Sequence, residues 1–179
     1  MTTQLKNRDT IVAFAFAGNA TITLRSTKTG KRFTFKLRRA KPKHDGQDES
    51  ELPLFVSLLN GPFNTDDYVF IGTIFPRSPS RLCASRKSRV TSAAPSFVAF
   101  AWWLTHIGDE RVEVWHEDKC GRCGRALTVP ESIATGLGPH CAAKMGVDIV
   151  SLAELETPIE EEQFPDLYDM DPTDQSLFE

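Results

Sequence analysis

Three of the four cysteines in this 179-residue chain fall between positions 120 and 141, in the stretch CGRCGRALTVPESIATGLGPHC. No apolar run reaches the roughly 18 residues that span a bilayer, and the N-terminus lacks the apolar core of a signal peptide. We therefore expect a cytoplasmic protein that does not contact membranes. Because cytoplasmic thiols stay reduced, a C-x2-C pair here indicates a metal site or a redox pair rather than a disulfide.

Zinc fits this cysteine pattern better than redox chemistry does. A C-x2-C loop turns tightly enough to direct Cys120 and Cys123 at one ion, and zinc takes four soft or borderline ligands in a tetrahedron. Gly138 and Pro139 predict a helix start, so Cys141 falls in a first turn, where the helix dipole favours the thiolate. A thioredoxin-type pair would instead open a long helix. We expect one structural Zn²⁺ closed by four protein ligands, and no catalytic residues.

The fourth ligand has two candidates. His116 ends the strand-like segment RVEVWH and precedes the first cysteine of the pair by four positions. His140 adjoins Cys141 in a helical turn, where neighbouring side chains diverge by about 100° and seldom meet at one ion. The spacing favours His116 and keeps His140 as the alternative, while Cys83 is expected to be a free, inert thiol.

Alternating apolar residues predict two β-hairpins. Residues 20–39 alternate around the turn KTGK, and residues 54–59 and 68–75 form a second pair around NGPFNTDD. A helix capped by a serine at 92 or 96 is expected to cover this four-stranded sheet, and short helices are expected near residues 130–136 and 139–144. Residues 10–17 are expected to form another short helix, with a strand as the alternative because their phenylalanines alternate. The fold class is α+β: a small antiparallel sheet of two hairpins covered by helix, then a zinc-ribbon or knuckle-like module and a disordered acidic tail.

Charge divides the chain. Residues 1–44 carry eleven Lys and Arg against one acid, whereas the residues after Lys144 carry eleven Asp and Glu and no base. Such asymmetry is typical of a chain with a nucleic-acid-binding end and a separate interaction tail. We expect an α+β domain at 1–110, a zinc module at 111–146 and an acidic, largely disordered tail at 147–179.

Basic residues of the first hairpin alternate with apolar ones, so one hairpin face should be positive while the other enters the core. Two further basic groups lie in a Ser-rich loop and beside the cysteine pair. Exposed aromatic residues for base stacking are not evident, because Phe33 and Phe35 are expected to face the core. The candidate nucleic-acid contacts are Arg25, Lys28, Lys31, Arg32, Lys36, Arg38, Arg86, Lys87, Arg89, Arg122 and Arg125.

The run WHEDKCGRCGRALTVPESIATGLGPHCAAK at 115–144 resembles a small zinc-ribbon-like domain of unknown function encoded by phages, prophages and plasmids. The shared pattern is an upstream His, then C-G-x-C-G-R-x-L-T-x-P-x-S-I and G-x-G-P-x-C. The β-rich region before it is similar to the N-terminal part of longer phage and plasmid members. The resemblance implies no activity, and it implies the zinc ligands His116, Cys120, Cys123 and Cys141.

Two functions fit these features. The first is a phage- or plasmid-type accessory protein with structural zinc that binds DNA or RNA through its basic N-terminal face. The second is a protein-binding effector or inhibitor of a host factor, whose acidic tail acts as a docking or charge-mimicking segment. Neither function needs a small-molecule substrate, and a phage-encoded protein would act in the host cytoplasm.

Overall fold

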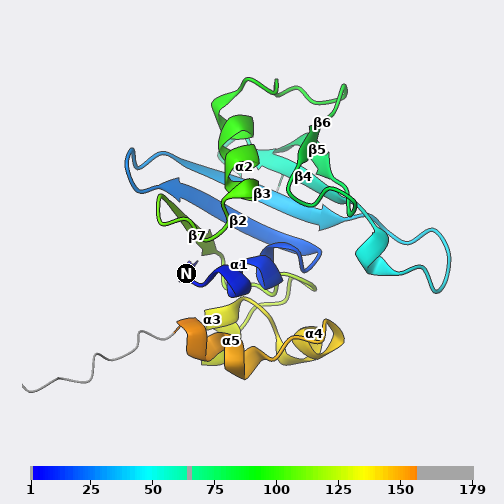
Figure 1. Cartoon of the computed structure of the whole chain (residues 1–179), viewed down its shortest axis with the longest axis vertical. Helices are drawn as coiled ribbons and strands as arrows, with labels where there is room; N and C mark the ends of the chain where they lie inside the picture. Colours follow the sequence, from blue (N-terminus) through cyan, green and yellow to red (C-terminus); the bar gives the residue numbers. More distant parts are fainter. Residues whose placement is uncertain (1, 64–65, 157–179) are drawn as a thin grey trace, which may run out of the picture.

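The computed structural model of the chain describes residues 2–63 and 66–156. These residues form an α+β fold around one seven-stranded antiparallel sheet with strand order β1-β7-β2-β3-β4-β5-β6 (Figure 1). The strands are β1 (Thr3–Leu5), β2 (Asn19–Ser26), β3 (Arg32–Arg39), β4 (Leu54–Leu59), β5 (Tyr68–Ile74), β6 (Leu82–Ala84) and β7 (Val112–His116).

Both predicted hairpins are confirmed. β2 pairs with β3, with Ile22 opposite Phe35, and β4 pairs with β5. Gly30 closes the first turn with a φ of 68°, a left-handed conformation that glycine adopts without strain. β3 also pairs with β4, so the two hairpins form one continuous sheet.

Three more strands extend the sheet beyond the four that were predicted. Strand β7 was expected to belong to the zinc module. It pairs with both β1 and β2 and therefore lies inside the sheet. The short strands β1 and β6 were not predicted, and β6 places Cys83 at the far edge of the sheet, opposite Thr73 of β5.

Two helices, α1 (Arg8–Ala15) and α2 (Pro95–Thr105), complete the main core. Alternation on β3 turns Phe35 toward them, and Phe100 of α2 packs on it with ring centroids 4.7 Å apart. Phe14 of α1 and Trp103 of α2 are also fully buried in this core. The predicted covering helix is therefore confirmed.

Prolines rather than side-chain caps begin the helices α2 and α3 (Pro130–Thr135). The N-caps are Ala94 and Val129, and neither makes a side-chain capping hydrogen bond. The predicted serine cap of α2 does not form. Proline fixes φ in the helical range, and the N–H that it lacks at the first helical position has no partner inside the helix anyway, which makes it a favourable first residue.

A smaller helical layer lies beside α1 (Figure 1). Besides α3 it consists of α4 (Pro139–Lys144) and α5 (Ile149–Glu156). Its core contains Ala17, Leu137 and Ala142 together with two of the cysteines. Because α1 contributes Phe14 to the main core and its flanking Ala17 to this one, it connects the two.

Helix α5 occupies the first part of the predicted acidic tail. It packs against α3 and α1 and buries Ala153. A helix thus replaces the disorder predicted for residues 149–156, because the apolar residues of IVSLA have a surface to cover. Residues 157–179, with the predicted docking or charge-mimicking segment, lie outside the described residues. No helix within the described ranges is long and apolar enough to cross a membrane.

Candidate functional site

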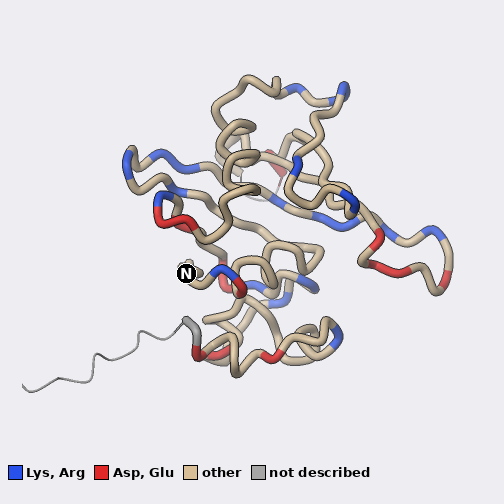
Figure 2. Tube along the Cα trace, viewed as in Figure 1, with Lys and Arg blue, Asp and Glu red and all other residues tan. Residues whose placement is uncertain are grey.

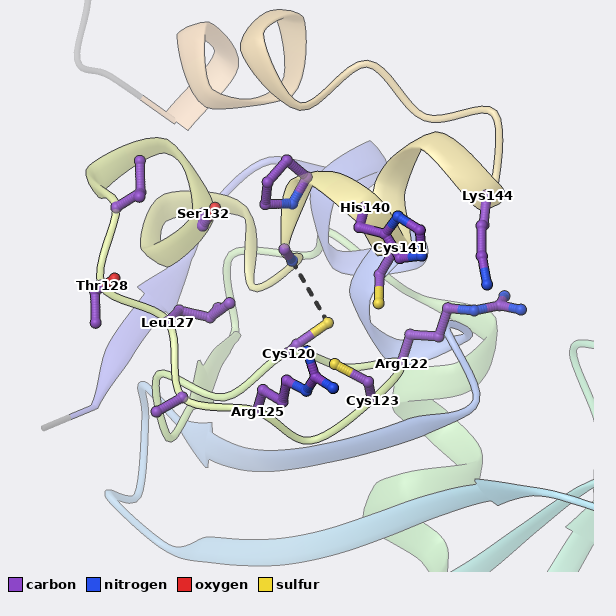
Figure 3. Close-up of a pocket in the computed structure, with 14 residues that line it drawn as sticks. Cys120, Arg122, Cys123, Arg125, Leu127, Thr128, Ser132, His140, Cys141 and Lys144 are labelled. Carbon is purple, nitrogen blue, oxygen red and sulfur yellow. Dashed lines mark hydrogen bonds between the residues drawn. The ribbon is translucent and has the colours of Figure 1, made fainter.

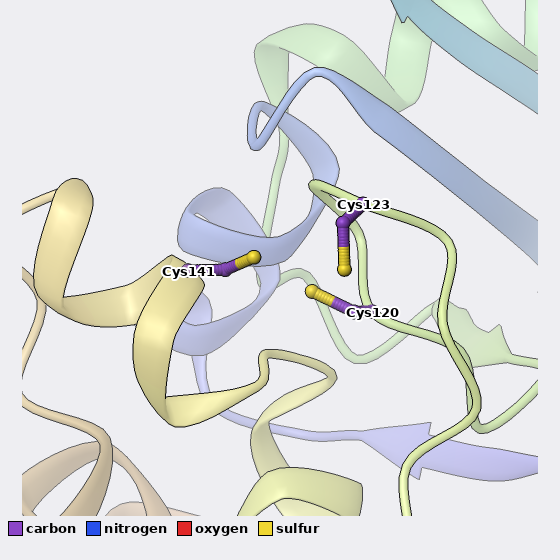
Figure 4. A group of neighbouring side chains, drawn as sticks. All are labelled: Cys120, Cys123 and Cys141. Atoms are coloured by element: carbon purple, nitrogen blue, oxygen red, sulfur yellow. The ribbon is translucent and has the colours of Figure 1, made fainter.

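A tight turn at residues 120–124 forms the first half of the cysteine site. The amide of Gly124 donates to the carbonyl oxygen of Cys120 at 2.8 Å, and the amide of Cys120 donates to the carbonyl oxygen of Arg125 at 2.8 Å. Gly124 has a φ of 76°, in the left-handed region that favours glycine. The turn brings the side chains of Cys120 and Cys123 next to each other (Figure 4).

Helix α4 supplies the third cysteine. Gly138 is its N-cap, which confirms the predicted helix start and places Cys141 in the first turn. The amide of Gly138 also donates a hydrogen bond to Sγ of Cys120 at 3.4 Å (Figure 3). This bond joins the turn to the helical half of the site.

The sulfur atoms of Cys120, Cys123 and Cys141 all lie within 4.8 Å of one another (Figure 4). Cys120 and Cys141 are buried, and Cys123 is exposed. Three thiolates at this spacing suit a thiophilic ion such as Zn²⁺. Within residues 2–63 and 66–156, no other group of three or more His, Cys, Asp or Glu residues has this geometry. The cysteine cluster is therefore a candidate metal site.

The thiols of the cluster differ in their proton affinity. Burial, together with the neighbouring Cys123 and Cys120 side chains, raises the pKa of Cys141 to about 12. For Cys120, burial disfavours the thiolate, but hydrogen bonds from the backbones of Gly138, Cys123 and Arg122 outweigh burial and lower its pKa. An arriving metal ion must therefore displace a proton from Cys141, whereas Cys120 ionises more readily.

A known family covers this part of the chain. Residues 113–146 match DUF6011, a family of unknown function. The DUF6011 segment extends from β7 through the cysteine turn and α3 to the end of α4. It therefore combines one strand of the sheet with all three clustered cysteines. No curated protein and no solved structure matches the chain.

The structure places His116 in the main core and not in the cysteine group. Its imidazole is buried, and its ring centroid lies 5.0 Å from that of Phe14. Among the described residues neither ring nitrogen has a hydrogen-bond partner; the backbone of Ile133 lies beside the ring but not in hydrogen-bond geometry. Burial lowers the pKa of His116, so the imidazole is neutral at pH 7. Its role as a zinc ligand stays a prediction.

His140 also falls outside the group of ligand atoms that lie within 4.8 Å of one another. It is exposed and lines, with the three cysteines, a pocket of about 570 Å³ (Figure 3). Arg122 and Arg125 line the same pocket, and Arg122 donates to a carboxylate oxygen of Glu49 at 2.7 Å. These two arginines therefore belong to the surroundings of the cysteine site.

The other predicted nucleic-acid contacts divide by position. Figure 2 shows basic residues along the β2–β3 hairpin and in the segment before α2. Arg86, Lys87 and Arg89 lie in that segment, and Lys28 and Lys31 lie in the hairpin turn. The remaining four share one face of the hairpin: Arg25, Arg32, Lys36 and Arg38.

We call the surface of the sheet opposite the main core the open face. On β2 and β3 it consists of alternate residues, with Arg25 opposite Arg32 and Thr21 opposite Lys36. None of the residues of β2 and β3 on this face is buried. The predicted division of the hairpin into a positive face and a core face is thus present in the fold.

Two hollows mark the open face. The larger, of about 610 Å³, is lined by Arg25 and Arg32, and the smaller, of about 230 Å³, by Lys36, Arg38 and Lys119. Glu117 lines both hollows. Lys119 was not among the predicted contacts, because nothing in its sequence neighbourhood shows that the chain returns to this face.

Aromatic residues on the open face correct the expectation that none is available for stacking. Trp115 lies opposite Thr23 and lines the larger hollow. Phe55 lies opposite Arg38 and is 41% exposed, and its neighbour Phe70 on β5 contacts it. Phe35 does enter the core, as predicted. The alternation VEVWH could have revealed Trp115, since it places the tryptophan on the side opposite Val114.

Proposed function

We propose that this protein binds nucleic acid through the open face of its sheet, and that the three cysteines of the DUF6011 segment hold a structural zinc ion. The observation that carries the proposal is the placement of Arg25, Arg32, Lys36 and Arg38 on one uncovered face. Phosphate contacts of this kind supply most of the affinity of sequence-independent nucleic-acid binding.

The interactions that these basic side chains already make are weak enough for a phosphate to compete with them. Arg25 pairs with Glu113 at 3.4 Å, and its side chain remains 52% exposed. Nζ of Lys36 lies 3.7 Å from the ring centroid of Tyr68. Exposed ion pairs contribute only about 0–1 kcal/mol. Glu113 and Glu117 are outnumbered by the Lys and Arg residues around them, so the open face keeps an excess of positive charge.

The surroundings of the three cysteines support a structural role for a metal ion bound there. Helices α3 and α4 have only six residues each, fewer than an isolated helix needs to be stable in water. Cys120 and Cys141 are buried in the small core between these helices and α1. An ion bound to them would fix the helical layer in place, as structural zinc does in other small modules.

Fluorescence anisotropy with labelled oligonucleotides at about 50 mM salt tests the function. Replacing Arg32, Lys36 and Arg38 together by glutamine should weaken binding by at least about tenfold, because three phosphate contacts are removed. The charge-matched control replaces Arg86, Lys87 and Arg89, predicted contacts that lie between β6 and α2 and not on the open face, by glutamine and should have a smaller effect. Equal losses in both variants would mean that only net charge matters and would contradict an open-face site.

The alternative function, an effector that acts on a host protein, depends on the acidic segment at 157–179. That segment lies outside the described residues, and no contact among the described ones favours this function. It becomes the better proposal if the wild-type protein binds neither DNA nor RNA at about 50 mM salt, where phosphate contacts contribute strongly.

A further inference from the structure

The aromatic residues of the open face lie on both sides of its basic strands. Trp115 is on β7, the basic residues are on β2 and β3, and Phe55 and Phe70 are on β4 and β5. Trp115 lies in the row of Thr34, whereas Phe55 lies in the row of Arg38, four residues further along β3. With strands about 4.8 Å apart and residues about 3.4 Å apart along a strand, Trp115 lies about 20 Å from both Phe55 and Phe70. The positive charge therefore lies between two aromatic sites.

The rings at these two sites are positioned for contact with a ligand. Phe55 and Phe70 meet edge to face, with centroids 6.0 Å apart and an interplanar angle of 76°. Nε1 of Trp115 donates to Glu113 at 3.2 Å, which holds the indole at the edge of the larger hollow. Tyr68 differs, because the ammonium group of Lys36 covers its ring. We therefore do not count Tyr68 as a stacking surface.

We infer that the open face binds single-stranded nucleic acid, with bases stacked on Trp115 and on the Phe55–Phe70 pair and with the phosphates between them on Arg25, Arg32, Lys36 and Arg38. The inference rests on the proposed function. Single strands expose the faces of their bases to aromatic side chains, whereas a duplex keeps those faces inside its stack. The larger hollow, of about 610 Å³, is within the size range of pockets that take small organic groups such as a base.

Binding of labelled dT15, rU15 and a 15-base-pair DNA duplex to the full chain tests this inference at about 50 mM salt. We expect both single strands to bind at least about tenfold more tightly than the duplex, and the ratio of dT15 to rU15 separates DNA from RNA as the preferred form. Base stacking on one aromatic side chain contributes a factor of about five or more to affinity. Trp115→Ala and Phe55→Ala should therefore each lose at least about fivefold in single-strand affinity.

A matched control is available because the chain has three tryptophans. Trp102 lies on α2, partly buried and stacked on His106, away from the open face. Trp102→Ala should leave single-strand affinity unchanged, and Trp115→Phe should keep most of it because a flat ring remains. If Trp115→Ala does not fold, Phe55→Ala and the quenching of tryptophan fluorescence by dT15 in the wild-type protein still test the stacking.

Two negative results have different meanings. If the duplex binds as tightly as the single strands and the aromatic variants bind like the wild type, while the open-face charge variant loses affinity, the single-strand inference is overturned and the proposed function stands. If no oligonucleotide binds, the proposed function fails and this inference fails with it.

Discussion

The imidazole of His116 packs against the ring of Phe14 with centroids 5.0 Å apart, inside the core that joins the sheet to α1. Its ring nitrogens have no hydrogen-bond partner among residues 2–63 and 66–156, and burial lowers the pKa of His116 below its ordinary value of 6.5. The unfolded chain, in contrast, takes up a proton at this histidine as the pH falls below about 6.5.

The free energy of unfolding should therefore decrease as the pH falls from about 6.5 toward the lower pKa of folded His116. One proton accounts for at most about 1.4 kcal/mol per pH unit. Urea denaturation at pH 7.5 and 5.5 should show this loss in the wild-type protein and a smaller loss in His116→Leu. An unchanged loss in the variant would assign the acid sensitivity to other groups.

Zinc titration of His116→Leu decides whether His116 is the fourth zinc ligand. An affinity equal to that of the wild type would restrict the protein ligands to residues other than His116, with His140→Ala as the next variant to test. A clear loss of affinity would mean that the imidazole leaves Phe14 to reach the ion, as the sequence spacing predicts.

The purified protein should contain about one zinc ion per chain, because three clustered thiolates form most of a tetrahedral site. Cys120→Ser and Cys141→Ser should lower the zinc content below about half an equivalent, whereas Cys83→Ser should not change it, since Cys83 lies in β6. Zinc affinity should rise with pH because the ion displaces the proton of Cys141, whose pKa is about 12. Metal analysis showing no zinc in the wild type would contradict the site.

Two glycines with left-handed backbones give a matched test of how the helical layer meets α1. Gly136 has a φ of 70°, and a Cβ there would overlap the ring of Phe14, while Gly146 has a φ of 66° and open space around it. Gly146→Ala should cost about 1 kcal/mol for its conformation alone. Gly136→Ala should cost about 1–3 kcal/mol more because of the overlap. Equal melting temperatures of the two variants would mean that the layer is not held against Phe14.

The hairpins and their core-facing residues could be predicted because alternation is a local signal, and it correctly turned Phe35 inward and Lys36 outward. The strands that pair with β7 could not be predicted, because the pairing of Trp115 with β2 joins chain segments about 90 residues apart in the sequence. The three cysteines were predicted from their spacing. His116 shows the limit of spacing, because its position in β7 turns the ring to the side of Val114 and into the core.

The acidic residues at 157–179 give a further prediction from charge. This segment contains eight Asp and Glu and no Lys or Arg, so it can compete with nucleic acid for the open face. Deleting it should strengthen oligonucleotide binding at about 50 mM salt, and the gain should shrink as the salt concentration rises. Unchanged affinity at low salt would show that the segment does not screen the open face.

The salt dependence of single-strand binding tests the open-face site most directly. The logarithm of the affinity falls with the logarithm of the salt concentration by about 0.7 for each phosphate contacted in a single strand. Replacing Arg32, Lys36 and Arg38 by glutamine should therefore reduce the slope by about 2, while replacing Arg86, Lys87 and Arg89 should leave it nearly unchanged. Equal slopes for the wild type and the open-face variant would contradict the assignment of nucleic-acid binding to this face.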